Sequence, residues 1–188
     1  MDALLIALLG CLLGEMGDKS QLLVLALATR YDRNGAIIAG IVAAAAANGA
    51  ISAFAGAWIG PMLGADARLL FMALSVLFLG AGLFWPVSRP DPLAGWPTGA
   101  FLTTALGVFI LGFGDGPQFL ILGIATRTAD PMLAGIGGAI GVIVALVPVV
   151  LLRDQLLAVL PLRAIRWTGG AILLLSGAIM AVSAIGLI

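Results

Sequence analysis

Long apolar runs take up almost all of this sequence. They cover residues 3–29, 35–59, 67–86, 99–126, 131–152 and 165–187. An α-helix needs roughly 20 apolar residues to cross the hydrocarbon core of a bilayer. Charged residues make up only 10% of the chain, against about a quarter of an ordinary soluble domain. The sequence therefore predicts an all-α integral membrane protein with six transmembrane helices.

The segments between the runs are short, so residues 1–188 are expected to form a single membrane domain. The formal net charge is zero, and no cluster of basic residues is present to bind nucleic acid. The expected partner of the apolar helices is the lipid bilayer. Whether two copies associate into a homodimer is left open by the sequence.

Arginines indicate the side of the membrane on which each loop lies, because short cytoplasmic loops carry an excess of Lys and Arg. The loops after the second and fourth runs hold only Arg68 and Arg127. The loops after the first, third and fifth runs, taken together with the first residues of the sixth run, hold Arg30, Arg33, Arg89, Arg153, Arg163 and Arg166. Both termini are therefore predicted on the non-cytoplasmic side.

A short polar motif occurs twice in the chain. Gly17-Asp18-x-x-Gln21 recurs as Gly114-Asp115-x-x-Gln118, at an offset of 97 residues. The same offset carries Ala28-Thr29-Arg30 onto Ala125-Thr126-Arg127. Self-similarity at a fixed period indicates repeated structural units.

The repeat divides the chain into residues 1–92 and 93–188, with three apolar runs in each half. Because three is odd, the second half must enter the membrane in the opposite orientation to the first. This inverted repeat is the architecture of many secondary transporters, in which the substrate binds near the bilayer midplane between the repeats. Both Gly-Asp motifs lie near the middle of their apolar runs, at that depth.

The first motif places hard oxygen donors in the middle of the first run. Glu15, Asp18 and Gln21 lie three residues apart and would share one face of a continuous helix. Calcium, magnesium and manganese prefer such ligands, and a chain with no histidine and one cysteine offers little to zinc or copper. Lys19 and Ser20 would adjust the charge of the site and support its ligands. A purely structural alternative is a buried Glu15–Lys19 pair.

The second motif adds Asp115 and Gln118 to the candidate site, and its recurrence favours a binding site over a structural pair. Charged side chains at the centre of a span cost about 2.5–3.5 kcal/mol each and usually mark ion pathways or proton relays. A carboxylate at which metal and proton compete lets a proton gradient drive the metal the opposite way. We therefore expect a cation/proton antiporter with Glu15, Asp18 and Asp115 as metal ligands, and no catalytic residues or resident cofactor.

A group of helix-disfavouring residues lies in the middle of the fourth run, and its members are Gly112, Gly114, Gly116 and Pro117. Proline has no amide hydrogen, so the carbonyl of Phe113 would lose its helical partner. Non-helical backbone at this depth is tolerated where it lines a cavity or is buried in protein. We predict that the fourth span is broken within residues 112–118 and that freed carbonyls help to bind the ion.

Asn48 brings an amide near the centre of the second run, inside the alanine-rich segment 43–50. Polar side chains in such segments often hydrogen-bond across helix interfaces, so helix packing is one interpretation. The other is that Asn48 supports the cation site and compensates for a ligand lost elsewhere.

The first motif carries a family resemblance. Glu15-Met16-Gly17-Asp18-Lys19-Ser20 fits the E-x-G-D-(K/R)-(S/T) signature and resembles the family of Golgi calcium/manganese–proton exchangers and bacterial manganese exporters. That family is built from two three-helix repeats, each with one signature in its first helix. The resemblance implies export of Mn²⁺ or Ca²⁺ against protons, with Glu15 and Asp18 as acidic ligands, in this case across a bacterial inner membrane.

The second motif departs from that signature. Gly112, Gly116 and Pro117 stand where the family has an acidic residue, a base and a hydroxyl. Only Gly114 and Asp115 carry over from it, together with the repeat-matched Gln118.

Three other functions stay open from the residues alone. One is a related exporter of an amino acid or of another metal, and another is a family member that binds an ion without moving it. Gly112-Phe113-Gly114-Asp115 also fits the pattern of intramembrane aspartyl proteases. The Tyr-Asp partner of those enzymes would fall in a loop here, at Tyr31-Asp32, so we expect no enzyme.

Overall fold

The computed structural model describes residues 1–187, apart from the side chains of residues 154, 157 and 158, and contains no β-strand within that range. Its elements, in chain order, are α1 (Asp2–Glu15), α2 (Lys19–Tyr31), α3 (Asn34–Ile59), the short 3₁₀ helix η1 (Gly60–Met62), α4 (Ala65–Gly82), α5 (Ala100–Gly112), α6 (Gly116–Ala125), α7 (Pro131–Leu152), α8 (Asp154–Val159) and α9 (Leu162–Ala184). The all-α expectation is therefore confirmed over the described residues.

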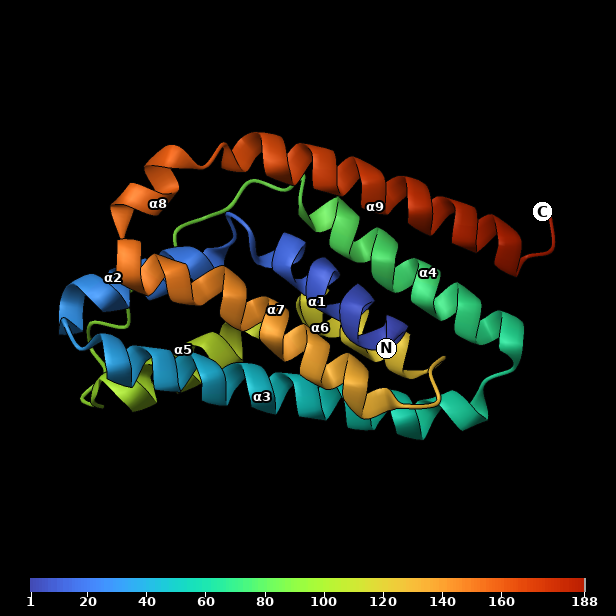
Figure 1. The fold of residues 1–188 in the computed structure, drawn as a ribbon, viewed down its shortest axis with the longest axis horizontal. Helices are drawn as coiled ribbons and strands as arrows, with labels where there is room; N and C mark the ends of the chain where they lie inside the picture. The colour runs from blue at the N-terminus through green and yellow to red at the C-terminus, as the bar shows by residue number, and fades with distance from the viewer. Residues whose placement is uncertain (188) are drawn as a thin grey trace.

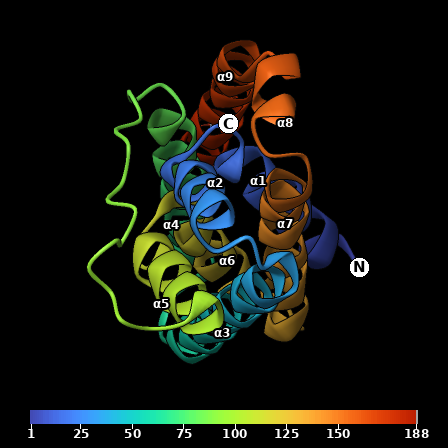
Figure 2. The same ribbon diagram turned by 90° about the vertical axis from the view of Figure 1, so that its left-hand side faces the viewer.

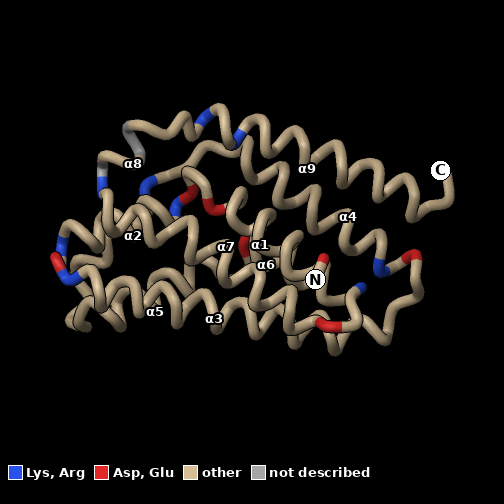
Figure 3. Tube along the Cα trace, in the orientation of Figure 1, with Lys and Arg blue, Asp and Glu red and all other residues tan. Residues whose placement is uncertain are grey.

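The helices lie side by side along one main axis, with both termini toward the same end of the bundle and α2 and α8 at the other (Figure 1). The chain runs away from the end that holds both termini in α1 and α2, and it runs back toward that end in α5 and α6. Segment 83–99, between α4 and α5, passes outside the helices (Figure 2). Charged residues gather at the two ends and in one group inside the bundle (Figure 3).

Several helices are long and apolar enough to cross a bilayer. They are Asn34–Met62, Ala65–Gly82, Pro131–Leu152 and Leu162–Ala184. α5 and α6 meet at an angle of 69° and together pass the same test as one bent span. The described part of the chain thus has four or five candidate spans by length and composition, which makes it an integral membrane protein.

The outer surface of the bundle is apolar. Large side chains such as Phe54, Ile172 and Leu175 are 74%, 65% and 66% exposed. A soluble protein rarely exposes a contiguous apolar patch larger than a few hundred Å², whereas lipid tails solvate such side chains readily. These exposed faces are therefore the ones expected to contact lipid.

Glycines let the central helices approach closely. A Cβ atom on Gly141 of α7 would lie 2.3 Å from the carbonyl oxygen of Leu8 in α1, and one on Gly49 of α3 would lie 2.6 Å from that of Gly135 in α7. Small residues at helix interfaces are the usual basis of packing within membranes. The contacts hold α1, α3 and α7 at short distances and so position the two breaks described below.

Candidate functional site

The first apolar run is not one helix. α1 ends at Glu15 and α2 begins at Lys19, and between them Gly17 has a φ of +69°. The backbone N–H of Gly17 donates to Oε1 of Gln21 at 2.9 Å, and Asp18 is the N-cap residue of α2. Our prediction of a continuous helix through Glu15, Asp18 and Gln21 is therefore wrong.

The physical reason lies in the Gly-Asp pair itself. A left-handed backbone is costly for residues with a Cβ atom and is readily adopted by glycine. Aspartate is among the favoured residues at the start of a helix. Gly17 therefore allows the chain to leave α1. Asp18 takes the N-cap position of α2, although its side chain makes no capping hydrogen bond there.

The second Gly-Asp motif has the same construction. α5 ends at Gly112 and α6 begins at Gly116, the region in which we predicted a break. Gly114 has a φ of +77°, and its N–H donates to Oε1 of Gln118. Pro117 lies in the first turn of α6, where its missing N–H costs least. The role of freed carbonyls in ion binding stays a prediction.

The two breaks match in detail. Asp18 has φ and ψ of −91° and 173°, and Asp115 has −91° and 168°. In each break the glycine before the aspartate is left-handed, and in each a glutamine four residues later accepts that glycine's N–H. The side chain of Asp115 also accepts a hydrogen bond from Gly116 N at 2.8 Å.

An ion pair joins the two breaks. Nζ of Lys19 lies 3.1 Å from Oδ2 of Asp115, and the two side chains are 39% and 25% exposed. The pairing runs between the halves of the chain, whereas the structural alternative placed Lys19 beside Glu15. Lys19 is thus engaged with a carboxylate, as a residue that moderates the charge of the site would be.

Arg166 reaches the same region from α9 and is only 8% exposed. Its guanidinium donates to the carbonyl oxygens of Gly17 at 3.1 Å, Gly82 at 3.2 Å, Trp85 at 3.1 Å and, more weakly, Met16 at 3.5 Å. It also lies 3.7 Å from Oδ1 of Asp18. One side chain therefore links α9, the first break and the end of α4.

This role of Arg166 was not predicted from the sequence, in which the residue contributed only to the excess of arginines assigned to the cytoplasmic side. One signal was available: residue 166 lies inside the sixth apolar run, 165–187, where a charged residue needs a partner.

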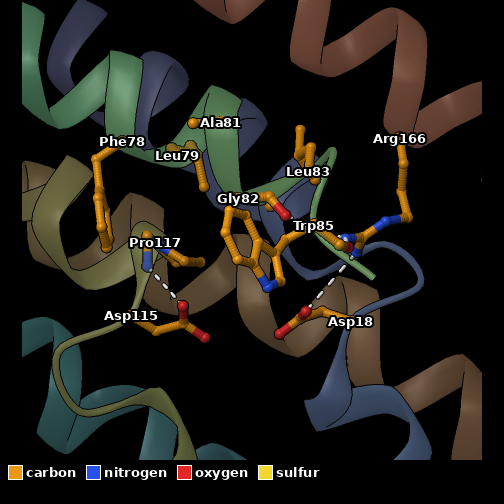
Figure 4. A pocket seen from close by; sticks show the side chains of 12 residues that line it. Asp18, Phe78, Leu79, Ala81, Gly82, Leu83, Trp85, Asp115, Pro117 and Arg166 are labelled. Carbon is orange, nitrogen blue, oxygen red and sulfur yellow. Dashed lines mark hydrogen bonds and ion pairs between the residues drawn. The ribbon is translucent and has the colours of Figure 1, made fainter. Parts of the chain in front are cut away.

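A cavity of about 330 Å³ separates the two aspartates. Asp18 and Asp115 both line it, and the indole of Trp85 points toward the space between their carboxylates in Figure 4. The remaining lining is mostly apolar and includes Phe78, Leu79, Leu83 and Pro117, with Arg166 on the Asp18 side. The cavity thus presents two carboxylates to a space large enough for a partly hydrated ion.

Glu15 lies outside this cavity. Its side chain is 3% exposed and lines a second, much smaller cavity together with Asn48 and Gln118. Within the described residues, no three Asp, Glu, Cys or His side chains are close enough to hold one metal ion. The structure therefore brings Asp18 and Asp115 together and leaves Glu15 in the neighbouring cavity.

The remaining predicted site residues are held by the surrounding helices. Gln21 is fully buried and donates through Nε2 to the carbonyl oxygen of Ala145 in α7 at 2.9 Å. Ser20 is also buried, at 1% exposure. Asn48 donates through Nδ2 to the carbonyl oxygen of Phe109 in α5 at 3.3 Å.

Comparison with known proteins identifies the family. The family model described as "Divalent cation/proton antiporter GDT1" matches residues 3–91 and 100–187. The chain belongs to this family. It is also 32% identical over 182 residues to a Vibrio cholerae serotype O1 protein named "Putative manganese exporter", covering 94% of this chain and 89% of that protein. No solved structure matches the chain.

Membership of the GDT1 family confirms the resemblance seen in the first motif and makes cation transport the activity that the comparisons support. A family of antiporters also argues for transport rather than catalysis.

Proposed function

We propose that the protein exports Mn²⁺, Ca²⁺ or both from the cytoplasm in exchange for protons. The observation that carries the proposal is the pair of matched breaks, whose aspartates face each other across one cavity. Discontinuous helices that meet near the midplane are the usual place of ion binding in secondary transporters. The family description and the name of the Vibrio relative agree with this activity.

The proposed architecture has six spans arranged as two inverted three-span repeats, 1–92 and 93–188. In it, α1 with α2 and α5 with α6 each act as one broken span. The opposite directions of these two pairs in Figure 1 support this arrangement, and so does the family match in two stretches. Both termini would lie on the non-cytoplasmic side, and the bacterial relative favours the inner membrane.

Ion binding would be a competition among cations. Lys19 and Arg166 lie close to Asp115 and Asp18 in this structure, so the charges of the two carboxylates are balanced from within. A divalent cation that enters the cavity would have to displace these internal cations or outweigh them. Glu15, Gln21 and Gln118 would then support the bound ion or proton, and the two repeats would rock about the site to expose it to either side.

The test is uptake of Mn²⁺ and of Ca²⁺ into inverted membrane vesicles under an imposed pH gradient. Vesicles with wild-type protein should take up at least one of these ions when the pH gradient is imposed and not in its absence. Glu15→Gln and Asp115→Asn should abolish this uptake. Asp66→Asn, which neutralises an exposed carboxylate in the first turn of α4, is the control and should transport normally.

The outcomes separate the candidate functions. Gradient-independent flux that survives both substitutions would refute the site. Absence of any Mn²⁺ or Ca²⁺ movement would refute the proposed cargo and leave export of another solute, an amino acid or a different metal, or a protein that has lost transport.

A further inference from the structure

Asn48 lies against the position at which the second break lacks an acidic residue. Position 112 is the repeat equivalent of Glu15 at the offset of 97 residues, and it is glycine. A Cβ atom placed on Gly112 would lie 2.8 Å from Nδ2 of Asn48. The amide of Asn48 therefore occupies the space that a side chain at position 112 would enter.

The repeat makes this substitution reciprocal. The equivalent of Asn48 at the same offset is Ala145, whose side chain is a methyl group. The first repeat's glutamate thus corresponds to Gly112, and the second repeat's alanine corresponds to Asn48. One break carries its polar group on the broken helix, and the other receives one from α3.

Glu15 and Asn48 line the same small cavity, together with Gln118. Its volume is about 20 Å³, which is enough for one water-sized particle. Oε2 of Glu15 and Oδ1 of Asn48 are buried and find no hydrogen-bond partner among the described residues. Burying polar oxygens without partners is unfavourable, and a ligand held in the cavity that both residues line would satisfy both atoms at once.

The donors in this cavity match one class of ligand. Nδ2 of Asn48 is engaged by the Phe109 carbonyl oxygen, which leaves its Oδ1 as the free acceptor. A carboxylate and amide carbonyl oxygens are ligands that Ca²⁺ and Mn²⁺ accept.

We propose that Asn48 supplies the ligand that the second break has lost, so that Glu15 and Asn48, with Gln118 beside them, form a binding position for one dehydrated divalent cation. This inference rests on the proposed function and adds a position beyond the Asp18–Asp115 cavity. The hydrated ion would enter between the two aspartates and lose water as it moves to Glu15 and Asn48.

The test is equilibrium binding of Mn²⁺ to purified protein, measured by titration calorimetry. Asn48→Ala should weaken binding by more than about tenfold, the usual cost of losing even an outer partner of a metal ligand. Ser52→Ala is the matched control, because Ser52 is buried one turn along α3 and does not line the cavity. It should bind as the wild type does.

Two further variants keep the test independent of folding. Asn48→Asp keeps the size of the side chain and adds a charge, so it should tighten binding of Mn²⁺. The double variant Asn48→Ala with Gly112→Glu returns an acidic group to the second break and should recover most of the affinity lost in Asn48→Ala.

The inference is overturned if Asn48→Ala binds Mn²⁺ like the wild type while Glu15→Gln binds weakly, a result that leaves the proposed function in place. It is also overturned if Asn48→Asp weakens binding. Absence of Mn²⁺ and Ca²⁺ binding by the wild type, together with absence of their transport, would instead refute the proposed function itself.

Discussion

Replacing Arg166 by glutamine should destabilise the protein strongly, because the guanidinium is buried and bonds to several separate groups. It donates to carbonyl oxygens of the first break and of the end of α4, and it lies 3.7 Å from Asp18. Removing one partner of a buried ion pair typically costs 3–5 kcal/mol, about the value of two hydrogen bonds to a charged group. Glutamine can still satisfy one or two of the carbonyls, so we expect a loss of about 3 kcal/mol.

The assay is thermal unfolding of the purified protein in detergent, followed by tryptophan fluorescence. For a chain of this length, about 3 kcal/mol corresponds to a fall in Tm of about 6–12 °C. Arg163→Gln removes the same charge from an exposed position one turn earlier in α9 and should change stability by less than about 0.5 kcal/mol. Arg166→Lys should fall between the two, because an ammonium keeps the charge and loses the planar fork.

The result that would refute this reasoning is an equal Tm for Arg166→Gln and Arg163→Gln. The contacts of Arg166 would then contribute nothing to stability, and its burial would have to be explained by transport alone.

Two further predictions follow from the breaks. Asp18→Asn should abolish transport more completely than Gln21→Ala, because it removes a charge and a titratable group together; equal activity of Asp18→Asn and the wild type in the vesicle assay would contradict the site. Gly17→Ala and Gly114→Ala should each lower stability by about 1 kcal/mol, since a left-handed backbone disfavours a Cβ atom. Gly35→Ala, at an open position in α3, should leave Tm unchanged or raise it slightly; a similar loss in all three variants would show that backbone handedness is not the cause.

Much of the fold could be predicted from the sequence because transmembrane helices are recognisable by their length and hydrophobicity. The apolar runs predicted an all-α membrane protein, and the signature around Glu15 predicted the family that the comparison found. The offset of 97 residues also aligned two Gly-Asp motifs that adopt nearly the same backbone angles.

We did not predict the first break because the residues that disfavour a helix differ between the two motifs. Gly112, Gly116 and Pro117 predicted a break in the second region, whereas the first region has Gly14 and Gly17 and no proline. The repeat makes Gly17 equivalent to Gly114, so the break predicted in the second motif also implies a break in the first. Left-handed φ at Gly17 is a consequence of that single residue, and no hydrophobic pattern reveals it.

The partners of Arg166 could not be found from the sequence at all. They are backbone carbonyls of segments about 80 and 150 residues away in the chain, exposed by helix ends whose positions depend on tertiary packing. The pairing of Lys19 with Asp115 is also a contact between the two halves, so it depends on how they meet.

The unequal chemistry of the two breaks has a thermodynamic consequence for the proposed transport cycle, in which the two halves exchange conformations. If both halves carried a glutamate at the Glu15 position, exchanging their conformations would regenerate the same site, and the two faces of the membrane would meet nearly equal affinities. With Gly112 in one half and Asn48 facing it, the exchanged state is a different chemical environment. The resting protein should then favour one orientation, because an ensemble is weighted by the free energies of its states. A cation would bind with unequal strength from the two sides, while the direction of net movement would still be set by the gradients.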